Sequence, residues 1–456
     1  MGRAAPLTAG ALAVALGVAA CYRAGDPQLV VQVDADVAVP PQIAGRADAS
    51  ADAAFDRLRV VTRWRGSDAR DNRDFQVGAL GVWPLSFGVS EGPGGEREVL
   101  LSLTLYKQSD AIGASDAAPA PGSVAITRLA SATIGDGRDA ARVVLHGECI
   151  GVPPDETRGV TCVDDPSALA PTTAGVTVAE RVVVPSPLGT WSRVATTPCA
   201  GERRDGRVCV PGGLVVLGDP AATDVADPSR VPVRALRAAV MSPFWLDETE
   251  VTVSKLRALL RGTGKTVPTG AERAGCNYTA AAGDADRQAA RCVPFDVARV
   301  VCQKLGGDLP TAARWDHAAR GRGERRRFPW GNADPRCCTS ALALGRGCSA
   351  STPLEVASHS KTDRCPSADV SRDGALDLGG SVREWVLDRA VPWDDPCFGP
   401  PGLARDPACV AAAGESGSAR GGSYLRSYDD AVASLRWRVD GADTDVGFRC
   451  AWEDAP

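Results

Sequence analysis

Residues 293–321 read VPFDVARVVCQKLGGDLPTAARWDHAARG, and this stretch predicts two short helices joined by a glycine turn. Three valines and Leu305 recur at helical spacing in the first half, which predicts a helix with one apolar face. Gly306 and Gly307 follow and permit the left-handed backbone that ends a helix. Thr311 is the expected N-cap of the second helix, which presents tryptophan and alanine on its apolar side.

The stretch DLGGSVREW, residues 377–385, predicts a tight loop with a carboxylate near each end. Asp377 and Glu384 would lie beside exposed backbone carbonyls, and such an oxygen-rich loop suits a hard cation. The alternative is that the two carboxylates only cap the loop or form salt bridges across it.

The first half of the chain has a different pattern. Runs rich in valine and leucine are separated by Gly, Pro and Asp turns and alternate with a period of two, which predicts strands. Residues 28–165 are therefore expected to form a small antiparallel β-sandwich. Residues 166–207, rich in Pro, Ser, Thr and Ala, are expected to link it to a second unit at 208–453.

The N-terminal stretch MGRAAPLTAGALAVALGVAAC, residues 1–21, predicts a signal peptide that is too short to span a membrane. Its ending resembles a bacterial lipobox, in which Cys21 would carry the lipid and become the first mature residue. The alternative is an ordinary cleaved signal peptide. The first interpretation predicts a membrane-anchored lipoprotein of the bacterial cell envelope, periplasmic or at the cell surface.

Cysteine usage agrees with export, because 15 cysteines less a lipidated Cys21 leave 14, an even number that can pair in an oxidising compartment. Several cysteine pairs have spacings that suit loop-closing disulfides, and these pairs are Cys149/Cys162, Cys199/Cys209, Cys276/Cys292 and Cys397/Cys409. None has the spacing of a zinc site. The net charge is −5, and the one basic cluster, at 320–331, lies in a glycine-rich stretch that is expected to be a solvated loop, so no nucleic-acid partner is expected.

Seven stretches, in this order, resemble the sulfatase-modifying factor family, also called the formylglycine-generating enzyme domain. They are VPGGLVVLGD (210–219), SPFWLDETEVTVSKLRALL (242–260), residues 293–321, RFPWGN (327–332), DLGGSVREWVLD (377–388), RGGSY (420–424) and VGFRCAWE (446–453). The resemblance covers roughly residues 208–453. It implies an α+β fold related to C-type lectins, with short elements and long loops.

The resemblance also implies a calcium ion in the 377–385 loop. Its ligands would be the carboxylates of Asp377 and Glu384 and the carbonyls of Gly380 and Val382. Ser381 stands where the family usually has Asn. The resemblance further implies a disulfide that ties the central helix to the last strand, and the matching residues are Cys302 and Cys450.

In catalytic members, RGGSY is followed by two cysteines that bind copper(I) and oxidise a substrate cysteine to formylglycine. Here Arg426 and Ala431 occupy those positions. Neither a guanidinium nor a methyl group can replace the soft thiolates that hold Cu(I). We therefore expect no copper and no catalytic residue at these positions.

Three functional hypotheses follow. The first is a non-catalytic, calcium-stabilised binding or structural module with a protein or glycan partner at the cell envelope. The second is a formylglycine-generating oxidase, or another protein-modifying oxidoreductase, that acts by a copper-independent route. The third assigns partner binding to the sandwich at 28–165 and leaves the C-terminal domain as a scaffold.

Overall fold

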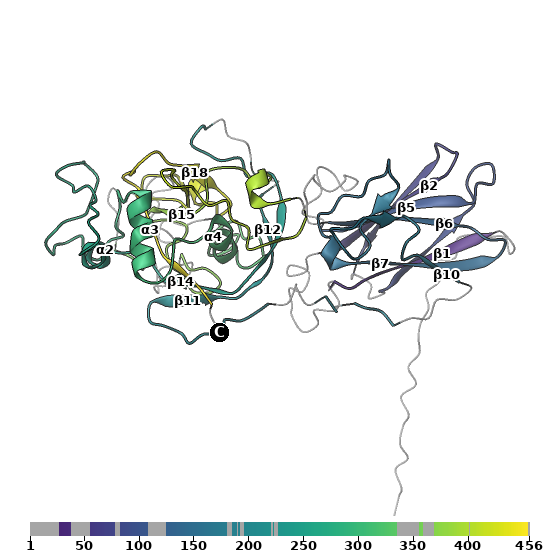
Figure 1. Ribbon diagram of the computed structural model, residues 1–456, viewed down its shortest axis with the longest axis horizontal. Coiled ribbons are helices and arrows are strands. Elements are labelled where there is room, and N and C mark those ends of the chain that lie inside the picture. Colours follow the sequence, from purple (N-terminus) through teal and green to yellow (C-terminus); the bar gives the residue numbers. More distant parts are fainter. Residues whose placement is uncertain are drawn as a thin grey trace, which may run out of the picture.

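A computed structural model of the protein shows its strands and helices in space (Figure 1). The residues that it describes are 27–37, 55–77, 83–107, 125–179, 185–188, 190–191, 196–219, 222, 227–334, 355–358, 369–400 and 402–454. The expected signal peptide and Cys21 lie outside them. Within these ranges no helix is both long enough and apolar enough to cross a bilayer.

Two four-stranded sheets form the part of the molecule drawn in purple and blue in Figure 1. The first has the order β10 (Thr177–Ala179), β7 (Arg138–Leu145), β1 (Gln28–Ala35), β4 (Leu85–Ser90). The second has the order β3 (Arg70–Gln76), β2 (Arg57–Trp64), β5 (Glu98–Tyr106), β6 (Ile126–Thr133). All neighbours pair antiparallel except β1 with β7, which run parallel.

The period-two pattern of these strands places their apolar side chains between the two sheets. Burial alternates along β2 and β5, as expected for strands with one face toward a core. Both sheets contribute fully buried side chains to one core cluster, among them Leu29, Val31, Val33, Leu101, Leu103 and Leu105. The cluster continues into Val216, Leu236 and Ala238 of the C-terminal part.

The segment expected to be a linker, 166–207, contains strands that the sequence did not predict. β9 (Ala170–Pro171) pairs with β8 (Val160–Thr161), and β10 pairs with β7. The first sheet therefore extends to Ala179 and does not end near 165. Strands of two or three residues are too short to show a period, and β10 is exposed along its whole length.

In the described residues of the C-terminal part, three small sheets combine with three short α-helices and long loops, drawn in teal to yellow in Figure 1. This is an α+β arrangement. The first sheet has the order β11 (Arg207–Val210), β14 (Phe244–Asp247), β20 (Ala451–Glu453). The second is β12 (Gly213–Leu217), β13 (Arg237–Met241), β16 (Ala404–Arg405). The third is β18 (Arg436–Arg438), β17 (Ser418–Arg420), β15 (Arg383–Val386), β19 (Val446–Gly447).

The helices are α2 (Val253–Leu260), α3 (Phe295–Lys304) and α4 (Ala312–Ala319), and the last two confirm the prediction from residues 293–321. The Thr311 side chain accepts a hydrogen bond from the backbone N–H of Arg314 at 3.1 Å, as an N-cap should. Gly306 has φ of 77°, the left-handed conformation that ends α3. Short 3₁₀ turns, η3 (Gly147–Cys149), η5 (Pro396–Phe398) and η6 (Tyr428–Ala431), complete the described elements.

Every cysteine among the described residues forms a disulfide. Cys302 on α3 is bonded to Cys450 at the start of the last strand, across 148 residues of chain. The other described disulfides close loops of 10 to 16 residues, and they are Cys149–Cys162, Cys199–Cys209, Cys276–Cys292 and Cys397–Cys409.

Candidate functional site

The RGGSY stretch forms part of the buried frame. Arg420 is completely buried and forms an ion pair with Asp316 of α4. Gly421 has φ of 80°, and a Cβ atom there would lie 2.8 Å from the carbonyl oxygen of Leu378, so only glycine fits. The Gly421 carbonyl accepts a hydrogen bond from Trp437 Nε1 at 2.9 Å. These contacts give the motif a structural role.

The two residues that follow this motif lie in different surroundings. The Arg426 guanidinium is centred 4.6 Å from the Trp437 ring, and its Nε lies 3.5 Å from a carboxylate oxygen of Asp445. Ala431 is completely buried and packs against Phe328. No described cysteine is unbonded, so no described residue offers a thiolate here. A guanidinium and a methyl group leave no soft ligand for Cu(I).

The carboxylate of Glu384, predicted to be a calcium ligand, lies against Arg449. Arg449 donates to it three times, at distances of 2.6, 2.8 and 2.9 Å, and Trp315 Nε1 donates at 2.8 Å. Both partners of the ion pair are almost completely buried. The sequence did not reveal Arg449 as a partner.

The loop that carries the other predicted ligands is also buried. Asp377, Gly380 and Val382 are all shielded from solvent. Asp377 and Ser381 each have φ of 60°, so two left-handed residues curve the chain between them. Asp377 accepts a hydrogen bond from the Ala357 backbone N–H at 2.5 Å.

Four buried acidic side chains influence one another around Arg449, and they are Glu250, Asp369, Asp377 and Glu384. One arginine cannot balance four carboxylates. Burial, and then the charge of Asp377, raise the pKa values of Glu250 and Asp369 well above their usual range. Burial raises the pKa of Asp377 to about 6.

Glu250 is the least satisfied member of this acidic cluster. Both of its carboxylate oxygens are buried and have no hydrogen-bond partner among the described residues, and the same holds for Ser381 Oγ. The Ser381 hydroxyl lies close enough to moderate the pKa of Glu250, but the contact lacks the geometry of a hydrogen bond. Unpartnered buried oxygens beside excess negative charge are what a bound cation would satisfy.

Sequence reasoning missed Glu250 and Asp369 as members of this cluster. Glu250 stands directly before the apolar Val251 in the stretch DETEVTV, and an acid beside a buried residue was the available signal. Asp369 gave no signal, because it follows a stretch without periodicity. The structure brings Glu250 to Asp377 although 127 residues separate them in the sequence.

Within the described ranges, one group of three metal-ligand side chains has its ligand atoms within 4.8 Å of one another, and it comprises Asp395, Cys397 and Cys409. Its two sulfur atoms are bonded to each other, so neither is a thiolate ligand. The acidic cluster around Arg449 is not grouped this closely. The buried histidine of α4, His317, makes its described hydrogen bond through Nε2 to the Pro211 carbonyl and is not part of a metal cluster there.

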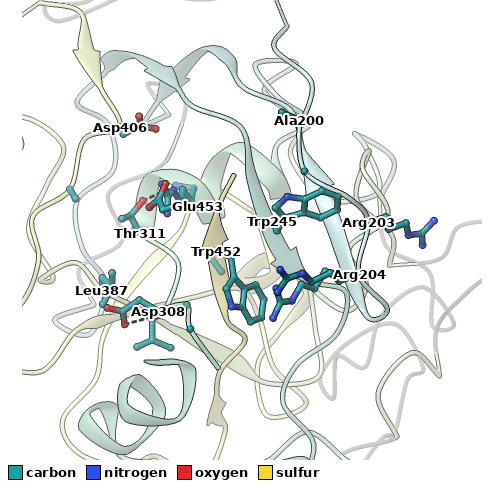
Figure 2. A pocket seen from close by; sticks show the side chains of 18 of the residues that line it. Ala200, Arg203, Arg204, Trp245, Asp308, Thr311, Leu387, Asp406, Trp452 and Glu453 are labelled. Atoms are coloured by element: carbon teal, nitrogen blue, oxygen red, sulfur yellow. Dashed lines mark hydrogen bonds and ion pairs between the residues drawn. The ribbon is translucent and has the colours of Figure 1, made fainter. Parts of the chain in front are cut away.

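A pocket of about 1070 Å³ opens elsewhere on the C-terminal part (Figure 2). Its walls come from the loop 200–207, strands β14 and β20, the turn between α3 and α4, and residues near 406. Trp245 and Trp452 line it, together with the arginines Arg203, Arg204, Arg207 and Arg314. The pocket is lined by neither Arg426 nor the acidic cluster.

A family model described as the sulfatase-modifying factor enzyme 1-like domain matches residues 194–454. The chain belongs to this family. The sulfatase-modifying factor domain begins, by this match, within the segment expected to be a linker. It contains α2 to α4, the acidic cluster around Arg449 and the pocket of Figure 2.

Two curated proteins are similar in sequence to this chain. A formylglycine-generating enzyme from Streptomyces coelicolor is 28% identical in an alignment 319 residues long, which covers 59% of this chain and 96% of that protein. A hercynine oxygenase from Mycolicibacterium smegmatis is 34% identical over 104 residues, 22% of either chain. Among solved structures, PvdO from Pseudomonas aeruginosa is similar with 22% identity and a TM-score of 0.43, over 57% of this chain and all of that one.

Proposed function

We propose that this chain is an exported lipoprotein whose sulfatase-modifying factor domain is a non-catalytic binding or structural module stabilised by calcium. The observation that carries the proposal is the pair Arg426 and Ala431 in the positions after RGGSY. The frame that holds this loop is kept, with Arg420 buried against Asp316, while the side chains that copper chemistry needs are replaced.

The acidic cluster supports the calcium part of the proposal. Calcium binds six to eight oxygen atoms in irregular geometry. The carboxylates of Asp377 and Glu384 and the carbonyls of Gly380 and Val382 would hold the ion, and Glu250 would add a charge. A cation would offset the surplus negative charge and the desolvation of the unpartnered Glu250 oxygens.

Export is supported by the leader sequence and by the disulfides of the described residues. In this proposal Cys21 carries the lipid, the membrane is reached through that lipid, and the partner is a protein or glycan of the cell envelope. Expression of the parent and of Cys21→Ser in a bacterium, followed by phase partition with detergent, tests the anchor. The parent is expected in the detergent phase and the variant in the aqueous phase.

Mass spectrometry tests the absence of catalysis. The full chain is incubated with a sulfatase-type cysteine peptide and oxygen, with and without Cu(I), and the Streptomyces coelicolor formylglycine-generating enzyme serves as the positive control. The proposal expects the peptide mass to stay unchanged. Conversion of the cysteine to formylglycine would overturn it and favour a copper-independent oxidase.

A further inference from the structure

The pocket of Figure 2 has an arginine-rich side formed by a short loop that is held in place at several points. The Cys199–Cys209 disulfide joins the two ends of this loop. The carboxylate of Asp454 accepts hydrogen bonds from the backbone N–H groups of Ala200 and Gly201, at 2.7 and 3.1 Å. Arginines on a loop fixed in this way lose less entropy when they bind a ligand.

The arginines on this loop take part in no described ion pair. Arg203 and Arg204 are exposed, and no described carboxylate forms an ion pair with Arg203, Arg204 or Arg207. Arg207 instead lies over the ring of Trp452, with its guanidinium 3.4 Å from the ring centroid. Burial, and then the charge of Arg204, lower the pKa of Arg207, while the charge of Asp247 raises it by a smaller amount, so the repulsion between Arg204 and Arg207 is only partly offset. An anion placed among them would relieve this repulsion.

The other side of the pocket is apolar. Trp245 and Trp452 are directly opposite each other on β14 and β20, so both indoles project from the same face of that sheet. Leu309 and Leu387 also line this side. An apolar side chain of a ligand therefore has a place beside the arginines.

Four acidic side chains also line the pocket, and one of them, Glu202 on the arginine loop itself, has no ion-pair partner among the described residues. The other three have partners of their own. Glu453 forms an ion pair with Arg314, and Asp308 forms one with Arg299. Asp406 accepts hydrogen bonds from the backbone and side chain of Ser242. The lining charges without an ion-pair partner on the 200–207 loop are thus Arg203, Arg204 and Arg207 against Glu202, and their balance is positive.

A carboxylate next to the pocket lining, that of Asp454, is bound by three of the lining residues. The side chain of Asp454 accepts a hydrogen bond from Trp245 Nε1 at 2.9 Å, in addition to those of the loop backbone. The indole faces, in contrast, offer little area for a stacked sugar. Arg207 covers Trp452, the backbone of Gly307 packs against the same ring, and only 7% of that residue is exposed.

We propose that this pocket binds an acidic peptide segment, whose carboxylates pair with Arg203, Arg204 and Arg207 and whose apolar side chain packs beside Trp245 and Trp452. The inference deepens the binding-module function proposed above and rests on it. Bidentate pairing between guanidinium and carboxylate gives such a site its selectivity for acidic over neutral segments. The volume, about 1070 Å³, accommodates a few peptide residues.

Fluorescence anisotropy tests the proposal with a labelled peptide of alternating glutamate and leucine and with its glutamine counterpart. The full chain is expected to bind the glutamate peptide, to bind the glutamine peptide about tenfold more weakly or less, and to lose affinity as salt is added. The double variant Arg203→Glu, Arg204→Glu is expected to weaken binding by about tenfold or more.

The matched control is Arg138→Glu with Arg261→Glu, which makes the same charge change at two exposed arginines outside the pocket. Its affinity should stay within about twofold of the parent. Equal affinity for both peptides, equal loss in both double variants, or no binding at all would overturn the assignment of the ligand. The cysteine-peptide assay tests the proposed function through a different readout, the formation of formylglycine. Failure of the peptide-binding proposal can therefore be told apart from failure of the proposed function.

Discussion

Arg449 and Glu384 form a buried ion pair in which the guanidinium donates three hydrogen bonds to one carboxylate. Arg449 also donates to the backbone carbonyls of Asp247, Glu248 and Leu376. One side chain therefore joins the strand β14, the loop before Asp377 and the strand β15. The ion pair holds the acidic cluster in place, so substitution of either residue should affect the stability of the domain.

Removing one partner of this pair should destabilise the domain strongly. Glu384→Gln removes the charged carboxylate that accepts three hydrogen bonds from the buried Arg449 guanidinium, and we expect a loss of about 3–5 kcal/mol in unfolding free energy. Urea unfolding in EDTA measures this effect apart from any metal. The control Asp296→Asn breaks the exposed pair with Lys265 and should cost less than about 1 kcal/mol. Similar losses in both variants would contradict the role given to Arg449.

Calcium should stabilise the parent more than a variant without the Glu250 charge. In EDTA, Glu250→Gln is expected to melt at a higher temperature than the parent, because burial and Asp377 disfavour a charged carboxylate there. With excess calcium, the rise in Tm should be larger in the parent. Thermal unfolding with and without calcium measures both effects.

The exposed residue Asp440 provides the control Asp440→Asn, which should respond to calcium as the parent does. Equal calcium shifts in Glu250→Gln and the parent would exclude Glu250 from the site.

Acid should weaken the fold through His317. Burial lowers the pKa of this side chain from 6.5 to about 4. Between these pH values the unfolded chain binds a proton that the folded chain does not, so stability falls as the pH falls, by up to about 3 kcal/mol. His317→Gln cannot titrate, so the stability advantage of the parent over the variant should shrink from pH 6.5 to pH 4. Urea unfolding at several pH values provides the measurement, and a constant difference would contradict the buried neutral histidine.

The Cys302–Cys450 disulfide should contribute more than the short-loop disulfides. It closes a loop of 148 residues, whereas Cys397–Cys409 closes one of 12. Loop-closure entropy gives about 5 kcal/mol for the first and about 3 kcal/mol for the second. Replacing each pair by alanines and comparing the unfolding free energies tests the order. A greater loss from the Cys397 and Cys409 replacement would reverse it.

Local patterns predicted the secondary structure where the interactions themselves are local. Thr311 caps α4 by accepting a hydrogen bond from the backbone N–H of Arg314, three residues on, and Gly306 ends the helix before it. Both boundaries could therefore be predicted from the sequence. The strands β2 and β5 are long enough for their alternation to show. The three-residue strand β10 is not, which is why its segment was expected to be a linker.

The sequence by itself determined the loss of the thiols at positions 426 and 431, since no folding can supply a sulfur atom that the residue lacks. It also indicated that Asp377 and Glu384 place a carboxylate near each end of one tight loop. Only the tertiary structure decided that Glu384 pairs with Arg449 and that Glu250 lies unpartnered beside Asp377. It alone assembled the arginines of the 200–207 loop with Trp452. Such charges and rings are brought together by packing between segments far apart in the chain. The spacing of residues along the sequence does not predict this packing.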